Sequence, residues 1–528
     1  MSSRASLPGG IEVEVEAVNS ASRRALYKKR EQIYPKLVQG RFRQVKWAAL
    51  IGLLAIYYAT PWLRWPRGPG RPDQAVLVDL GGRRFYFFEL ELWTQEAYFL
   101  AGLLILAAVV LFLATALFGR VWCGYACPQT VWTDLYLYIE RLCEGDRNAR
   151  IKRDKAAWSL DKVARKFAKH GLWLVTAAAT GGAWVFYYSD APRLFADIFA
   201  GQASSTVYLF VGLLTFTTYT LAGTMREQVC TYMCPWPRIQ GAMIDQDALS
   251  VTYRALRGEP RGPHRKGEPW TGRGDCIDCK QCLAVCPQGI DIREGDQLEC
   301  INCALCIDAC DAVMDKVERP RGLIAYDSWA NLQRMQAGKP AKLRFFRPRT
   351  ILYAVLLAAI SGLLLYQLGA RQRINLDVWP ERSPPYVRLA DGSIRNDYRL
   401  QIINKTHEAR VLRLAVADAP GAVLWLSGGG APGEVQSFSA AANDVTTLRL
   451  HVRMPAAGPG GPRAITLQLR NPKDGAIIDT VATAFLEPRP LSEKVESRFL
   501  VRKRSEFSDL RIFGHKTATT LLLKMREP

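Results

Sequence analysis

The chain has 528 residues, 49% of them hydrophobic, a formal net charge of +21 and thirteen cysteines. It is too long for one ordinary domain, so we expect several units. Basic residues cluster beside apolar runs, which favours a membrane surface over nucleic acid as the partner of the positive charge, and no cysteine follows Cys310, which excludes a disulfide framework throughout a secreted chain.

A basic arm over residues 1–46 precedes the first apolar run, which begins too late for a secretory signal peptide. Five segments then have the length and apolarity of bilayer spans. Four of them, within a 47–225 transmembrane region, cover 47–63, 98–118, 171–188 and 206–224, and the fifth covers 351–370. We therefore predict an α-helical bundle of about five spans in a multidomain membrane protein.

Lysine and arginine set the orientation of these spans. They are abundant in the N-terminal arm and in the 119–170 loop, whereas the loop between the third and fourth spans has only Arg193. The positive-inside rule then predicts that the N-terminus and residues 226–350 lie in the cytoplasm. Five crossings predict that the region after residue 370 is periplasmic, in a bacterial inner membrane.

The 226–350 segment carries two cysteine runs between basic linkers, each with the spacing C-x2-C-x2-C-x3-C. This is the bacterial ferredoxin spacing, in which the fourth cysteine of each run serves the other cluster. It predicts an inserted ferredoxin-like α+β domain with two [4Fe–4S] clusters; a zinc site or structural thiols are the alternatives. The predicted ligand sets are Cys276, Cys279, Cys282 and Cys310, and Cys300, Cys303, Cys306 and Cys286.

A second motif follows the second and fourth predicted spans. Cys123-Gly-Tyr-Ala-Cys127-Pro and Cys230-Thr-Tyr-Met-Cys234-Pro repeat the pattern C-x-Y-x-C-P. Cysteines at i and i+4 share one helix face, so two such pairs at one membrane depth could bring four thiols together. Soft thiolates would suit Cu(I) or a further cluster. A redox-active dithiol and simple packing remain alternatives.

Other cofactors have little support in the sequence. Only His170 of the five histidines lies near a predicted span, which argues against a bis-histidine haem, and we interpret His170 as an interfacial residue. No C-x-x-C-H motif or Rossmann glycine fingerprint stands in context. Short alternating runs over 371–487 predict an immunoglobulin-like β-sandwich without cysteine. A basic extension over 488–528 has no predicted role.

Several motifs resemble the CcoG/FixG/RdxA family of cytochrome oxidase accessory proteins. They are Phe118-Gly-Arg-Val-Trp-Cys123, Glu144-Gly-Asp-Arg-Asn-Ala-Arg150, Cys234-Pro-Trp-Pro-Arg-Ile-Gln-Gly and Gly274-Asp-Cys-Ile-Asp-Cys279. The resemblance covers about residues 30 to 487. It implies a role in maturing a cbb3-type cytochrome c oxidase, by reducing Cu(II) to Cu(I) for insertion, with the oxidase or its copper-assembly factors as partners.

The predicted topology limits the mechanism, because every candidate redox ligand lies on the cytoplasmic side. A quinol or a cytoplasmic reductant would supply electrons, and copper near Cys123, Cys127, Cys230 and Cys234 would accept them. Two alternatives remain. The chain could be a quinol-oxidising electron-delivery subunit, similar to NapH-type proteins, or an assembly scaffold whose clusters sense redox state.

Overall fold

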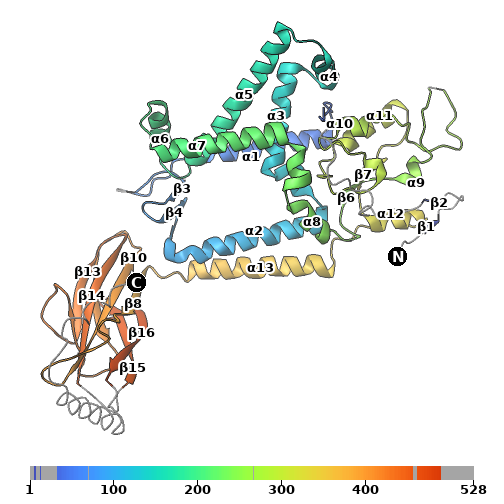
Figure 1. The fold of residues 1–528 in the computed structure, drawn as a ribbon. Coiled ribbons are helices and arrows are strands. Elements are labelled where there is room, and N and C mark those ends of the chain that lie inside the picture. The colour runs from blue at the N-terminus through green and yellow to red at the C-terminus, as the bar shows by residue number, and fades with distance from the viewer. Residues whose placement is uncertain are drawn as a thin grey trace, which may run out of the picture. The chain divides into compact units, whose positions relative to one another are not determined.

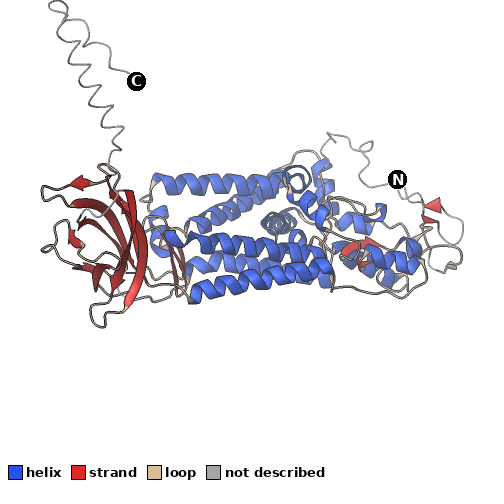
Figure 2. Cartoon of the chain, turned by 90° about the horizontal axis from the view of Figure 1, so that it is seen from below, coloured by secondary structure: helices blue, strands red, loops and turns tan. Residues whose placement is uncertain are grey.

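The computed structural model describes residues 5–6, 12–13, 32–68, 71–265, 267–455 and 461–488. The chain divides into two compact units, Met1–Tyr366 and Gln367–Pro528. Helices dominate the first unit and strands the second (Figures 1 and 2). Most of the predicted N-terminal arm and nearly all of the predicted 488–528 extension lie outside the described residues.

Three helical segments of the described chain are long and apolar enough to cross a membrane: Thr94–Phe118, Ser205–Met225 and Pro348–Gly369. The first contains α2 (Ala97–Phe118), the second contains α7 (Ser205–Thr218) and the π-helix η5 (Tyr219–Met225), and the third is α13. Few of their residues are buried inside the protein, so their apolar side chains are available to lipid. A Cβ on Gly102 of α2 would contact Leu364 of α13, so these two helices pack together (Figure 1).

The two other predicted spans are helical, but they do not reach the same apolarity. Helix α1 (Arg41–Ala59) opens with a basic turn that includes Arg43 and Lys46. Helix α5 (Leu160–Val185) has a charged first half and an apolar second half. A helix that combines a charged and an apolar portion has a lower mean hydropathy than a span that is apolar throughout. Five spans are therefore not confirmed, and crossings by α1 and α5 stay predictions.

Shorter helices connect these segments and surround the cysteines. They are α3 (Pro128–Glu144), α4 (Arg147–Lys155), α6 (Ala191–Phe199), α8 (Trp236–Met243), α9 (Ala255–Gly258), α10 (Gln281–Val285), α11 (Leu305–Lys316) and α12 (Trp329–Gln336). A three-stranded antiparallel sheet lies between α1 and α2 in the chain and consists of β3 (Val76–Asp79), β4 (Arg84–Phe87) and β5 (Leu90–Trp93).

Both ferredoxin-type cysteine runs lie between two strands that pair with each other. Strand β6 (Ser250–Tyr253) is antiparallel to β7 (Ile324–Asp327), so the chain returns to its starting point after passing through α10 and α11. Buried Val251 and Ile324 of these strands pack in one cluster with Cys276 and Cys282. The pairing therefore closes a small α+β unit around the cysteines.

The second unit is a β-sandwich of two antiparallel sheets. One has the strand order β12-β14-β10-β8, with β9 (Val387–Arg388) paired to β10, and the other has the order β13-β11-β15-β16. The bounds are β8 (Ile374–Pro380), β10 (Ile394–Asn404), β11 (Arg410–Val416), β12 (Val423–Leu426), β13 (Val435–Ala440), β14 (Asp444–Met454), β15 (Gly461–Arg470) and β16 (Ile477–Glu487).

Alternate residues of the sandwich strands form its core, including Leu400 and Ile402 of β10 and Ile465 and Leu467 of β15. The Tyr398 hydroxyl donates to the carbonyl of Ala484, 2.8 Å away on the opposite sheet. These inward-facing residues are the period-2 apolar positions that predicted the strands. The alternating runs at 398–403, 409–416, 423–426, 446–454, 464–469 and 480–486 correspond to six strands and do not cover β8, β9 or β13. In β13 polar residues follow most apolar ones, and only Gln436 and Ala440 are buried.

Candidate functional site

The two ferredoxin-type runs fold into loops of the same backbone form. Asp278 and Lys280 in the first loop and Asn302 and Ala304 at the matching places in the second have positive φ angles between 52° and 60°. Asp and Asn tolerate this left-handed conformation better than most residues. Lys280 and Ala304 are the N-cap residues of α10 and α11, the helices that carry the third cysteine of each run. The repeated backbone form explains why both runs need the same spacing.

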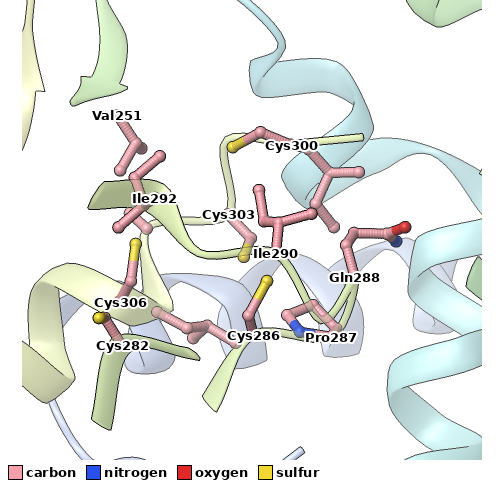
Figure 3. Close-up of a pocket in the computed structure, with 13 residues that line it drawn as sticks. Val251, Cys282, Cys286, Pro287, Gln288, Ile290, Ile292, Cys300, Cys303 and Cys306 are labelled. Atoms are coloured by element: carbon pink, nitrogen blue, oxygen red, sulfur yellow. The ribbon is translucent and has the colours of Figure 1, made fainter. Parts of the chain in front are cut away.

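Cys300, Cys303 and Cys306 of the second run line one cavity with Cys282 and Cys286 of the first run (Figure 3). The sulfur atoms of Cys286, Cys303 and Cys306 face the space between the loops, and Cys300 closes its far side (Figure 3). Burial and the neighbouring Cys303 thiol raise the pKa of Cys286 to about 11. Burial also raises the pKa of Cys300 to about 12. Iron would supply the positive charge that such crowded, buried thiolates require.

Cys310 has the other thiols of the first run as neighbours. Burial and the nearby thiols of Cys282, Cys279 and Cys276 together raise the pKa of Cys310 to about 12. Cys306 instead interacts most strongly with Cys303, Cys300 and Cys286. Cys310 of the second run thus has thiols of the first run as its neighbours, which agrees with the predicted exchange of fourth cysteines. Both sets of four thiols have a donor chemistry that fits a cubane cluster.

The two C-x-Y-x-C-P motifs meet in another cavity of about 880 Å³, which we call the thiol pocket. Cys123, Cys127, Cys230 and Cys234 all line it, together with Trp236 and other largely apolar residues. Burial and, to a smaller extent, the other thiols of the pocket raise the pKa of both Cys123 and Cys230 to about 12. Cys123 donates a hydrogen bond to the Gln240 amide oxygen at 3.1 Å.

The cysteine pairs lie on π-helical turns, not on the α-helical face that the sequence predicted. These turns are η4 (Trp122–Ala126) and η6 (Val229–Met233). The amides of Cys127 and Cys234 each donate to the carbonyl five residues earlier, at 2.8 Å. The proline after each pair lacks an N–H and ends the turn. Single π-turns of this kind are rare and occur frequently at functional sites.

The thiol pocket packs directly against the second ferredoxin loop. The Arg120 side chain donates to the Cys300 carbonyl at 3.0 Å, and the Tyr125 hydroxyl donates to the Cys303 carbonyl at 3.2 Å. A Cβ on Gly124 would lie 2.8 Å from the Ile301 carbonyl oxygen, so only glycine permits this approach. Cys123 and Cys303 belong to one buried cluster. Sequence reasoning missed Gln240 and the role of Gly124, although both lie in the quoted motifs.

No group of three or more His, Cys, Asp or Glu residues in the described part of the chain converges on a single metal-ion position. A cubane differs from a single ion, because each thiolate binds a different iron atom. The four thiols of the thiol pocket line one cavity, but they do not converge on a position for a single metal ion. Cys143 lies elsewhere and packs beside Tyr136 and Trp173.

Three family models match the chain. A 4Fe-4S dicluster domain matches residues 225–329, a 4Fe-4S binding domain matches residues 100–142, and the IG-like fold at the C-terminal of FixG matches residues 364–488. The first covers both ferredoxin-type runs and the second covers Cys123 and Cys127. These matches identify an iron–sulfur protein with an immunoglobulin-like C-terminal domain.

Three curated proteins are similar along most of their length. Nitrogen fixation protein FixG of Rhizobium meliloti is 48% identical over 473 residues, which is 84% of this chain and 90% of that protein. Protein RdxB of Cereibacter sphaeroides is 50% identical over 83% of this chain and 92% of its own length. Protein RdxA of the same organism is 48% identical over 84% of this chain and 93% of its own length.

Proposed function

Since the chain belongs to the FixG/RdxA family of iron–sulfur proteins, we propose that it reduces Cu(II) to Cu(I) at the thiol pocket. The Cu(I) would serve the maturation of a cbb3-type cytochrome c oxidase. One observation carries the proposal: four cysteines share a cavity whose wall packs on the loop of Cys300 and Cys303. A substrate site for a soft metal thus lies against a predicted one-electron donor.

We assign the two [4Fe–4S] clusters to the eight ferredoxin-type cysteines. The thiols that neighbour Cys310 and Cys306 support one set of Cys276, Cys279, Cys282 and Cys310, and a second set of Cys300, Cys303, Cys306 and Cys286. When bound, the clusters supply single-electron transfer. The protein's own contribution is a dry, apolar wall that includes Val285 and Ile301, which keeps water from the thiolates.

Copper would bind in the thiol pocket near Cys123, Cys127, Cys230 and Cys234. Thiolates are soft ligands that favour Cu(I) over Cu(II), so the pocket would stabilise the product of the reaction. One electron from a cluster converts one Cu(II) to one Cu(I). Each thiol that binds copper releases its proton to water and replaces one of the ligands that copper brought with it. Gln240 holds the Cys123 thiol in position by accepting its hydrogen bond.

The proposed setting is the bacterial inner membrane. The basic arm and the 119–170 loop support a cytoplasmic position for the thiol pocket and the ferredoxin unit. The β-sandwich would then lie in the periplasm, where it would dock the oxidase or a copper-assembly factor. All the redox thiols lie in the first unit, which supports a cytoplasmic delivery of Cu(I).

The test starts from purified protein in detergent, reduced with dithionite and freed of excess reductant under anaerobic conditions. Stoichiometric Cu(II) is added, and the EPR signals of the clusters and of Cu(II) are followed together. We expect the Cu(II) signal to disappear as the clusters reoxidise. The double variant Cys230→Ala/Cys234→Ala should slow this step at least tenfold while both clusters remain intact.

Cys143→Ala is the matched control, because Cys143 lies outside the thiol pocket and both ferredoxin sets. It should behave as the wild type. Unchanged copper reduction in the double variant would contradict the site assignment. Reduced clusters that persist beside Cu(II) would contradict copper reduction itself, and would favour an electron conduit or a redox-sensing scaffold.

A second candidate function for the thiol pocket has support from one comparison. The 4Fe-4S binding domain model covers Cys123 and Cys127, so the pocket could hold a further cluster instead of substrate copper. Iron analysis separates the two. A further cluster predicts more iron than two [4Fe–4S] clusters contain, and a loss of that excess in the Cys230→Ala/Cys234→Ala variant.

A further inference from the structure

A cavity of about 810 Å³ lies where the span Ser205–Met225 ends, and we call it the boundary cavity. Its wall includes His170 and Trp173 of α5, Gly223 and Thr224 of η5, and Arg226 and Glu227 just after that π-helix. Neither the cysteine chemistry nor the β-sandwich accounts for it. Its position at the end of an apolar span makes it reachable by a membrane-soluble molecule.

The charges that line the boundary cavity balance one another. Its wall contains Lys169 and Arg226 as cations and Glu140 and Glu227 as carboxylates. The Lys169 ammonium is paired with Glu144 at 3.1 Å, and Arg226 is paired with Glu140. An anionic lipid head group or a phosphate would therefore meet no uncompensated positive charge. The cavity fits a neutral, polar ligand.

The buried ring of Trp173 lies behind one side of the cavity. Trp173 is 2% exposed, and its indole N–H donates to the Tyr136 carbonyl at 3.2 Å, so the ring is held in place. A Cβ on Gly223 would lie 3.0 Å from this indole, so glycine lets η5 pack against the ring. Lys169 and Arg226 lie over this ring at 5.2 and 5.3 Å from its centroid, and His170 meets it edge-on, so the indole holds the wall of the cavity in place.

His170 provides proton chemistry beside that ring. Its Nδ1 lies 2.8 Å from the Tyr219 hydroxyl, and its ring centroid is 5.2 Å from that of Trp173. No described residue forms a hydrogen bond with its Nε2. Burial lowers the pKa of His170, and the neighbouring Lys169 lowers it further, so the ring is neutral at pH 7 and can accept a proton.

The boundary cavity shares two lining residues with a cavity beside the redox thiols. Arg226 and Glu227 line a third cavity, whose other walls include Cys230 of the thiol pocket and Pro287 and Gln288 of the ferredoxin unit. Pro287 and Gln288 in turn line the cavity of the second cysteine set. A ligand in the boundary cavity would thus be separated from Cys230 by Arg226 and Glu227.

We propose that the boundary cavity binds the head group of a membrane quinol, with His170 as the first proton acceptor. Oxidation breaks two O–H bonds of the quinol and releases two protons and two electrons. His170 takes one proton and passes it to water at the exposed mouth of the cavity, and the second follows the same route. This inference rests on the proposed function, because the electrons leave singly for the two clusters assigned there.

The first experiment measures binding without electron transfer. Oxidised protein in native membranes is photolabelled with an azido-decylbenzoquinone, and the labelled peptides are mapped by mass spectrometry. We expect labels within 160–185 and 205–227, competed by excess decylubiquinone. His170→Gln should reduce this labelling about tenfold, the effect of one lost hydrogen bond of about 1.4 kcal/mol. The matched control His264→Gln, at a histidine stacked on Trp270 outside the cavity, should label as the wild type.

The second experiment mixes oxidised protein anaerobically with decylubiquinol or menadiol and follows cluster reduction by EPR. We expect reduction in the wild type and in His264→Gln, and at least tenfold slower reduction in His170→Gln. Dithionite-reduced His170→Gln should still reduce Cu(II) at the wild-type rate, because copper binds elsewhere.

Labels spread evenly over the apolar helices, or unaffected by His170→Gln, would overturn the quinol site. Displacement of the label by phosphatidylglycerol but not by decylubiquinone would replace it with a lipid site. Clusters that pass electrons from dithionite to Cu(II) but accept none from either quinol would overturn this inference alone. Clusters that accept electrons from quinol but never reduce Cu(II) would instead overturn the proposed function.

Discussion

Gly124 shows how a single hydrogen in place of a side chain positions the thiol pocket. A Cβ at this residue would lie 2.8 Å from the Ile301 carbonyl oxygen and 3.0 Å from that of Asn302. Both are backbone atoms of the loop that carries Cys300 and Cys303, so neither can rotate away. The distance between the proposed copper site and the second cluster therefore depends on this glycine.

Gly124→Ala should push the 120–127 segment away from the ferredoxin loop. Overpacking of this kind costs about 1–3 kcal/mol of stability. We expect a lower unfolding temperature and slower oxidation of the dithionite-reduced clusters by Cu(II), measured by stopped-flow absorbance. Gly52→Ala on α1 is the control, because a Cβ there meets no atom within 4 Å. Equal rates in both variants would show that the close approach is unnecessary for electron transfer.

Among the elements, α1 and α11 are joined by one carboxylate. Asp308 of α11 accepts hydrogen bonds from the backbone amides of Phe42 at 3.2 Å and Arg43 at 2.8 Å. These amides belong to the first turn of α1, where no partner exists within the helix. Asp308 lies between Cys306 and Cys310, so the helix that carries two predicted cluster ligands also caps a helix of the predicted membrane bundle.

Asp308→Ala should leave both amides without their partner and cost about 1–2 kcal/mol. We expect faster hydrogen exchange at residues 41–46, measured by mass spectrometry, with Asp308→Asn intermediate because an amide oxygen can still accept. Asp315→Ala is the control on the same helix, since Asp315 pairs with Arg321 at the exposed surface. Identical exchange in Asp308→Ala and Asp315→Ala would argue that α1 is held by other contacts.

At the scale of the whole molecule, the ferredoxin unit and the β-sandwich are stabilised by different interactions. The cores around α10 and α11 mix cysteines with a few apolar residues, whereas the core of the β-sandwich contains no cysteine. A small unit with such a limited core is stabilised chiefly by its metal ligation. The sandwich has twenty buried residues in one continuous core and needs no metal.

Removal of iron with an oxidant and a chelator should therefore unfold only part of the protein. We expect the unfolding transition of the ferredoxin unit to be lost in differential scanning calorimetry, while that of the β-sandwich keeps its midpoint. Hydrogen exchange should rise across 276–316 and stay unchanged across 394–454. A shift of both transitions together would show that the sandwich depends on the clusters for its stability.

The sequence by itself predicted the features that depend on local spacing. The two cysteine runs imply iron–sulfur ligation because three thiols must come from one tight loop, and the family comparisons confirm an iron–sulfur protein. Six sandwich strands followed from period-2 alternation, and three apolar segments followed from their length. For partly charged helices such as α1 and α5, a membrane crossing was harder to predict from the sequence, because a short apolar run does not distinguish a span from a buried helix.

The tertiary structure alone decided which distant segments meet. Cys123 and Cys230 are more than a hundred residues apart in the chain, yet they line one cavity, and the repeat could only suggest this. The contact of Gly124 with Ile301 and the boundary cavity around Trp173 have no periodic signal at all. Such contacts arise from the packing of whole helices, which depends on every side chain between them and not on the spacing of a motif.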